Sequence, residues 1–161
     1  MIAVEAYGPN FEFLVANMKR NGAANVSCHH LAIGNEIGPV SLFHSSNDGG
    51  HLLFDHNAIE GRLTESSTVD GTTLSSLLEE NQIRRVSFLK LDCEGAEFPI
   101  LLNAPGSTLQ RIDRMAMEYH DEVTDHGHEE LVDRLRCGGF EVSASPSKGG
   151  GPFGHIWAKR P

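Results

Sequence analysis

The segment Val-Ser-Phe-Leu-Lys-Leu-Asp-Cys-Glu-Gly-Ala-Glu, residues 86–97, constrains the fold more than any other part of the chain. Its first half, Val86 to Leu91, is short and mostly apolar, which is typical of a strand buried on both faces. The run stops at three carboxylates, Asp92, Glu94 and Glu97, and residues 96–102 predict a helix. A strand, a polar turn and a helix in this order indicate an α/β sheet, and such sheets bind ligands outside the carboxyl ends of their strands.

Two explanations account for these carboxylates. Acids gathered at the carboxyl edge of a sheet are candidates for chemistry. Acids at the start of a helix also complement the positive end of its dipole, with no role beyond stability. Spacing alone leaves both explanations open.

The remaining elements extend the α/β pattern, and we expect strand 86–91 at the centre of the sheet, flanked by strands 2–7 and 115–119. Strands are predicted over residues 2–7, 25–33, 115–119, 140–144 and 155–159, and helices over 11–20, 73–81 and 129–137, the first capped by Asn10. Residues 34–72 have no clear period, although 40–44 predict a strand and 68–70 a short edge strand. The Pro- and Gly-rich loop before residue 155 predicts an antiparallel hairpin. No linker divides the chain, so we expect one domain over residues 1–161.

Charge and cysteine content exclude several classes of function. The formal net charge is −9, which argues against nucleic acid or an anionic membrane as a partner, because both need a basic face. No apolar run has transmembrane length and no signal sequence is predicted. Three cysteines without metal-type spacing favour a reducing compartment, so we expect a cytoplasmic protein. His44, His51 and His56 lack regular spacing and are expected to be solvated rather than metal ligands.

Lys90-Leu-Asp-Cys-Glu-Gly-Ala-Glu97 resembles the signature of the FkbM-type methyltransferases, which use S-adenosylmethionine. Weaker matches follow in the family's order, at Pro9-Asn-Phe, Leu31-Ala-Ile-Gly34, residues 69–78, Met117-Glu-Tyr-His120 and Gly139-Phe140. The resemblance implies a Rossmann-like class I methyltransferase sheet, mostly parallel, with an antiparallel edge at its C-terminal end. It implies methyl transfer to a hydroxyl of a sugar or natural product.

The resemblance also suggests roles for individual residues. Asp92 would lie near the reacting methyl group and contribute to cofactor binding, with Ala32 and Ile33 forming the adenine pocket. His120 would serve as the base, and Glu94, Glu97 and Glu118 would bind the acceptor. His120 has a structural alternative, a strand-end histidine bonded to nearby backbone. A metal held by Asp92, Glu118 and His120 is a further alternative, whereas a metal-dependent hydrolase lacks any ligand spacing.

Two departures from the family pattern concern the cofactor. The chain begins one strand late, so the glycine-rich turn that cradles the methionine end is absent, and the glycine clusters at 48–50 and 149–151 are predicted to be loops. The family's ribose-binding acid is replaced by Gly8, and Glu5 is a poor substitute because it lies on the opposite face of the strand.

Three explanations of the late start remain open. Strands 2–7 and 86–91 close the gap, the chain is part of a longer protein, or a second copy supplies the edge in a homodimer. A non-catalytic binding module with this fold is therefore the alternative to an enzyme.

Overall fold

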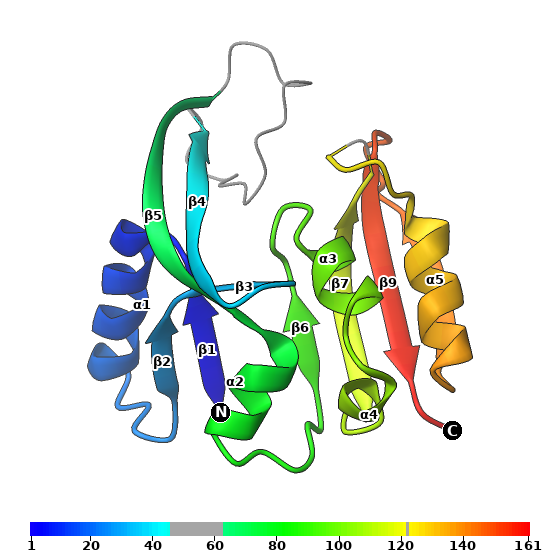
Figure 1. The fold of residues 1–161 in the computed structure, drawn as a ribbon, viewed down its shortest axis with the longest axis horizontal. Helices are drawn as coiled ribbons and strands as arrows, with labels where there is room; N and C mark the ends of the chain where they lie inside the picture. Colours follow the sequence, from blue (N-terminus) through cyan, green and yellow to red (C-terminus); the bar gives the residue numbers. More distant parts are fainter. Residues whose placement is uncertain (46–62, 122) are drawn as a thin grey trace.

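The computed structural model describes residues 1–45, 63–121 and 123–161 (Figure 1). His51, His56 and the glycines at 49 and 50 lie outside these residues, as does the side chain of His44. In chain order the elements are β1 (Ile2–Glu5), α1 (Gly8–Arg20), β2 (Ser27–His30), β3 (Ala32–Gly34), β4 (Gly38–Ser45), β5 (Leu63–Thr73), α2 (Leu74–Glu80), β6 (Leu89–Leu91), α3 (Glu97–Leu102), α4 (Gly106–Leu109), β7 (Arg114–His120), α5 (His128–Cys137), β8 (Glu141–Pro146) and β9 (Phe153–Lys159).

The described strands form three sheets, and the α/β class is confirmed. β1 and β2 pair in parallel, β5 lies between β3 and β4, and the third sheet has the order β6-β7-β9-β8. β6 and β7 are parallel, whereas β9 is antiparallel to both β7 and β8. The antiparallel C-terminal hairpin is therefore confirmed.

The predicted centre of the sheet is where the structure departs most from expectation. Only Leu89–Leu91 of the predicted strand 86–91 forms β6, although Val86 makes a single parallel bridge to Ile112. Within the described residues β1 pairs only with β2, and β6 only with β7, so β6 ends its sheet instead of lying beside β1. The prediction that strands 2–7 and 86–91 are neighbours is wrong, and closure of the gap by these two strands is excluded for this structure.

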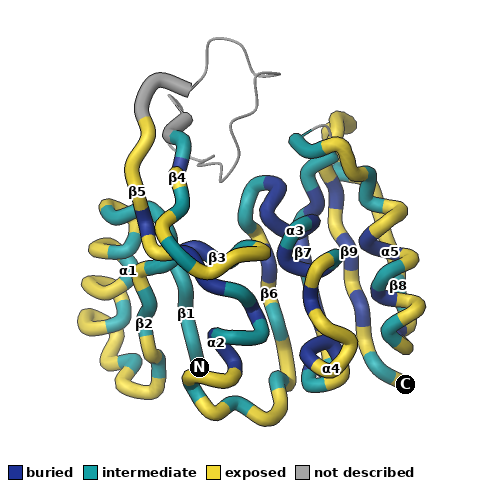
Figure 2. The backbone as a smooth tube through the Cα atoms, viewed as in Figure 1, coloured by how far each residue is buried: buried dark blue, intermediate teal, exposed yellow. Residues whose placement is uncertain are grey.

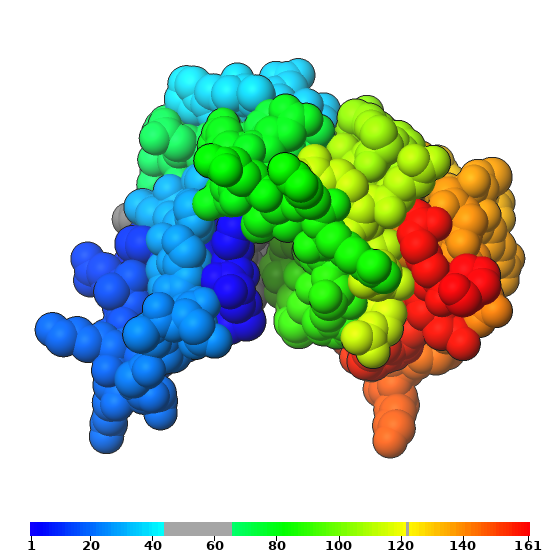
Figure 3. All heavy atoms as spheres, turned by 90° about the horizontal axis from the view of Figure 1, so that it is seen from below, coloured from blue at the N-terminus to red at the C-terminus, as the bar shows by residue number. Residues whose placement is uncertain are grey.

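We call the space between β1 and β6 the slot. Seen from the amino ends of these strands, it is a hollow between the N-terminal segment, in blue, and the green segment that carries β6 (Figure 3). Figure 1 shows the same separation from the side, with both arrows pointing the same way.

Smaller corrections concern the N-terminal half. The predicted strand 25–33 is two strands, β2 and β3, which belong to different sheets. Residues 68–70 lie inside the 11-residue β5, the middle strand of its sheet, and not at an edge. Helix α1 begins at Gly8 with Tyr7 as its N-cap residue, so Asn10 is not the cap. Pro9 suits this start, because a first-turn N–H has no helical partner to lose.

The buried residues that form the hydrophobic core all lie at or after Ala32. Its principal cluster draws on α2, α3, α5 and the β6–β9 sheet, with Phe98, Leu101, Leu131, Leu135 and Ile156 fully or almost fully buried. No residue among the first 31 is fully buried, and Figure 2 shows α1 as exposed and half-buried turns. Among the described residues, no helix combines the length and apolar character that crossing a membrane requires.

Gly154 gives a direct test of packing in this sheet. A Cβ atom here would collide with the Ser145 carbonyl oxygen and the Tyr119 hydroxyl. Gly154→Ala should therefore cost about 1–3 kcal/mol and lower the melting temperature by roughly 2–10 °C, as measured by circular dichroism. Gly149→Ala is the control, because nothing lies within 4 Å of its Cβ position; equal melting temperatures for the two variants would contradict the packing shown here.

Candidate active site

The turn that follows β6 has an unusual backbone. Glu94 has φ of 51° and Gly95 φ of 99°, so two successive residues lie in the left-handed region. A non-glycine residue there is uncommon, and such conformations cluster at functional sites. Two features require glycine at position 95. Its φ lies in the left-handed region, and an added Cβ would come within 2.5 Å of Val123 Cγ1.

The carboxylate of Glu97 holds this turn together from inside. Its side chain is fully buried. One oxygen accepts the N–H of Cys93 at 2.9 Å and the other accepts the N–H of Gly95 at 2.8 Å. Acceptor binding, predicted for Glu97, does not fit this environment, because both oxygens already serve the backbone and neither reaches solvent. We assign Glu97 to the architecture of the turn.

His120, the last residue of β7, packs against the same turn. Its Nδ1 lies 3.3 Å from Glu97 Oε1 and its Nε2 lies 3.5 Å from Glu94 Oε2. The Nδ1 atom is buried and lacks a well-aligned hydrogen bond, so its nearest partner is the Glu97 carboxylate. The His120 side chain is only 12% exposed, whereas that of Glu94 is 35% exposed. The imidazole therefore lies between an inner and an outer carboxylate.

This arrangement changes the protonation of both groups. Burial lowers the pKa of His120, but the carboxylates of Glu97, Glu94 and Glu118 outweigh it and raise the pKa above its ordinary value. The pKa of Glu94 is also raised, mainly by burial and further by the charges of Asp92, Glu97 and Glu118, while His120 opposes the shift. Both groups therefore hold a proton to higher pH than the isolated side chains do, which is typical of residues at functional sites.

The other predicted site residues are only partly brought together. Asp92 is exposed and forms an ion pair with Lys90, its Oδ2 lying 2.6 Å from Nζ. Among the described residues no ion pair joins Asp92 to His120. Glu118 lies two residues before His120 on β7, hence on the same face of the strand. No group of residues in the described part of the chain has the arrangement of a metal site, and the metal alternative finds no support there.

We call residues 92–97, the turn that Glu97 holds together, the clasped turn. The other residues predicted to hold the cofactor lie on β1 and β3, outside this turn. Glu5 is the last residue of β1, and its Oε1 accepts the Tyr7 N–H at 2.8 Å. Ala32 is buried in a small cluster with Leu42 and Val69, and Ile33 packs against the principal core. The cavity beside Ala32 is about 60 Å³, far below the 300–1,000 Å³ of ordinary ligand pockets. An adenine pocket at Ala32 and Ile33 thus stays a prediction.

Sequence reasoning missed a second polar contact beside the site. Asp121 follows β7. Its Oδ1 accepts a hydrogen bond from the backbone N–H of His128 at 2.7 Å, and its Oδ2 lies 2.7 Å from Nδ1 of the same histidine. The His128 ring stacks on Tyr119 with centroids 4.2 Å apart. Asp121 therefore connects the end of β7 to the first turn of α5. In the sequence, the only indication of this contact is an acidic residue seven positions before the start of the helix.

Replacing the inner carboxylate tests the assignment of Glu97. Glu97→Gln should lower the pKa of His120, measured by NMR titration of its ring, because the largest favourable interaction with the imidazolium is lost. The raised pKa means that His120 adds stability which is complete below about pH 6.5 and is lost as pH rises through the folded-state pKa. Glu80→Gln, at an exposed position, is the control. An unchanged His120 titration in Glu97→Gln would contradict the assignment.

Comparison with known proteins agrees with this geometry. Residues 2–142 match the family model described as the methyltransferase FkbM domain. The chain is 26% identical over 159 residues to Methyltransferase 1 of Beauveria bassiana, covering 89% of this chain and 63% of that protein. It is 31% identical over 101 residues to the AMB antimetabolite synthetase AmbE of Pseudomonas aeruginosa, covering 59% of this chain and 5% of that protein.

A solved structure shares the fold. Precorrin-6y C5,15-methyltransferase from Geobacter metallireducens superposes with a TM-score of 0.50 and 14% identity, covering 99% of this chain and 66% of that one. The chain spans less than two thirds of the length of the two curated relatives named above. The family model covers most of the chain and includes the clasped turn and β7, and on this ground the chain belongs to the FkbM methyltransferase domain family.

Proposed function

We propose that this chain transfers a methyl group from S-adenosylmethionine to a hydroxyl group of a small molecule, such as a sugar or another natural product. The observation that carries the proposal is the clasped turn, which sets Asp92, Glu94 and His120 around the carboxyl ends of β6 and β7. Ligands of open α/β sheets bind at this edge. Nucleic acid and anionic membranes are not expected partners of a chain with a net charge of −9.

The described residues fit this cofactor only in part. Glu5 and Asp92 place carboxylates at the carboxyl ends of β1 and β6, on the two sides of the slot. Gly8 stands where the family has its ribose-binding acid, and in the described part of the chain no glycine-rich turn joins a strand to a helix at the top of the slot. The residues present therefore do not supply a backbone cradle for the methionine end.

The acceptor side is better equipped. When bound, S-adenosylmethionine supplies a sulfonium-bound methyl group whose departure leaves S-adenosylhomocysteine. His120 would accept the hydroxyl proton of the acceptor on Nε2, while Glu97 stabilises the resulting imidazolium from the Nδ1 side. Glu94 and Glu118 would hydrogen-bond the acceptor's other hydroxyl groups. Such transfer depends above all on alignment of donor and acceptor, which the rigid turn favours.

Asp92→Asn is the direct test. With millimolar S-adenosylmethionine and a panel of sugar and polyketide hydroxyl acceptors, the variant should lose about ten- to a hundredfold in rate, as expected when a charged hydrogen bond is removed. Its melting temperature should stay within about 1 °C, since an exposed strand-end acid adds little to stability. If Asp92 serves only the helix dipole, the rate should hold and the melting temperature should fall instead by a few degrees.

A second candidate is a non-catalytic domain of the same fold. Gly8 and the cavity of about 60 Å³ favour it, because both weaken the case for cofactor binding. The same assay separates the candidates, since a binding module transfers no methyl group at any cofactor concentration.

A further inference from the structure

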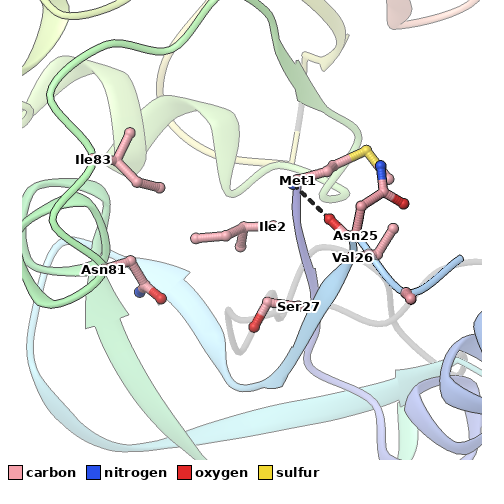
Figure 4. Close-up of a pocket in the computed structure, with 8 residues that line it drawn as sticks. Met1, Ile2, Asn25, Val26, Ser27, Asn81 and Ile83 are labelled. Atoms are coloured by element: carbon pink, nitrogen blue, oxygen red, sulfur yellow. Dashed lines mark hydrogen bonds between the residues drawn. The ribbon is translucent and has the colours of Figure 1, made fainter.

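A groove of about 460 Å³ opens at the amino ends of β1 and β2, at the opposite end of the strands from the clasped turn. Ile2, Asn81 and Ile83 line it, and the Met1 amino group donates to the Asn25 carbonyl oxygen (Figure 4). Its described lining includes no charged side chain. The groups that select a ligand by charge therefore lie elsewhere, at the carboxyl edge of β6 and β7.

Two carboxylates at that edge already have partners. Asp92 pairs with Lys90, its Oδ2 lying 2.6 Å from Nζ. Glu97 is fully buried, accepts two backbone N–H groups, and lies 3.3 Å from Nδ1 of His120. Neither carboxylate presents an uncompensated charge to a ligand.

The other two carboxylates, Glu94 and Glu118, are less well compensated. Glu94 is 35% exposed and has only Nε2 of His120 beside it, at 3.5 Å. Within the described residues the half-buried side chain of Glu118 forms no ion pair or hydrogen bond, and its charge raises the pKa values of Glu94 and His120. His155, opposite Glu118 on β9, is positive only when protonated. This edge therefore has surplus negative charge.

An aromatic ring lies next to the proposed base. Phe153, the first residue of β9, is the direct cross-strand partner of His120, so the two side chains share one face of the sheet, with Cβ atoms about 4.5–5.5 Å apart. Phe153 is 38% exposed. An exposed aromatic ring covers the apolar face of a cyclic ligand and attracts a cation.

We propose that the methyl acceptor is a cyclic alcohol that carries an ammonium group, which rests on the proposed function. The acceptor ring lies on Phe153 and its ammonium group faces Glu94 and Glu118. The hydroxyl oxygen of the acceptor bonds to the methyl carbon as the carbon–sulfur bond breaks, and the hydroxyl proton passes to Nε2 of His120. The ammonium group keeps its proton and serves recognition only. Acceptors that carry a carboxylate or phosphate are rejected by like charge.

The probes are three cyclohexane rings with the same hydroxyl group, trans-4-aminocyclohexanol, trans-cyclohexane-1,4-diol and trans-4-hydroxycyclohexanecarboxylate. Each is titrated into ¹⁵N-labelled protein at about pH 8, where the amine is protonated and an ordinary histidine is neutral. Amide shifts of Glu94, Glu118 and His120 report binding. The amine should bind roughly tenfold more tightly than the diol, and the carboxylate more weakly than the diol. Equal affinities, tightest binding of the carboxylate, or no binding of the amine at tens of millimolar would overturn the proposal.

Two variants assign the preference to residues. Glu118→Gln should remove the preference for the amine and leave binding of the diol unchanged, because the amide keeps the shape without the charge. Phe153→Leu should weaken binding of both the amine and the diol, since both lose the ring face. Glu80→Gln, at an exposed position on α2, should bind like the wild type, and circular dichroism checks that all three variants fold. A full preference for the amine in Glu118→Gln would contradict the proposal.

Methyl transfer to the same probes separates the charge preference from the proposed function. Transfer to none of them, with the amine still bound most tightly, would count against methyl transfer and support the charge preference. Transfer to the carboxylate as fast as to the amine would support methyl transfer and overturn the charge preference.

Discussion

Titration of S-adenosylhomocysteine into this chain should give a dissociation constant weaker than micromolar. The family's ribose-binding acid is replaced by Gly8, and loss of one charged hydrogen bond costs about 1.5–3 kcal/mol, or roughly ten- to a hundredfold in affinity. The described residues form no glycine-rich turn, and binding without one should cost at least as much again. In the structure β1 leads through Ala6 and Tyr7 directly into α1, and the slot beside it holds no described backbone that could replace the turn.

Calorimetry with matched variants makes this prediction specific. Gly8→Glu restores an acid at a position with ordinary φ, where a Cβ makes only ordinary contacts with His30 at 3.8 Å. It should tighten binding up to about tenfold, whereas Gly8→Ala should not. A chain extended by a strand and a glycine-rich turn that fill the slot should gain at least a hundredfold. Micromolar binding by the unextended chain would show that the site is assembled in another way, most simply by a second chain.

His120→Gln should lower the rate of methyl transfer by about 10²–10⁴-fold, the usual contribution of a general base. Glutamine keeps polar atoms at similar positions but cannot accept the proton. A base must be neutral to act, so the wild-type rate should rise with pH through the raised pKa of His120. Glu97→Gln should move this rise to lower pH, since it removes the carboxylate that favours the imidazolium.

The pH profile distinguishes a base from a structural histidine. If His120 only supports the turn, His120→Gln should reduce stability and rate together, and the profile of Glu97→Gln should match that of the wild type. Assays at several cofactor concentrations keep weak cofactor binding from masking the result. A full wild-type rate in His120→Gln would exclude the proposed role.

Local sequence patterns predicted most elements, because each carries its own signal. Leu74, Leu77 and Leu78 marked the buried face of α2, and Thr73 caps it through a bond to the Ser76 N–H. The pairing between strands was less accessible. Nothing in residues 25–33 signals the break at Leu31 that sends β2 and β3 into different sheets, since that break depends on the distant partner β5.

The site shows the same limit. The carboxylates after β6 were visible as a cluster, and their position at the carboxyl edge followed from the strand pattern. The sequence did not show which of these carboxylates is buried and which is exposed, because Asp92, Glu94 and Glu97 are chemically similar. Burial and the two backbone N–H donors of the turn separate Glu97 from the others, and both depend on how the left-handed pair Glu94 and Gly95 folds the chain back.

The uneven core has a consequence for how this molecule opens. No residue before Ala32 is fully buried, and among the described strands β1 does not pair with β6. The unit of β1, α1 and β2 therefore packs against the rest through few apolar contacts, among them those of Ala6 and Tyr7 with the small cluster of Ala32, Leu42 and Val69. Units of this kind exchange their amides through sub-global opening at a lower free energy than global unfolding. We therefore expect the amides of β1 and β2 to exchange through such openings, whereas those of β7 and β9, beside the principal core, exchange only on global unfolding.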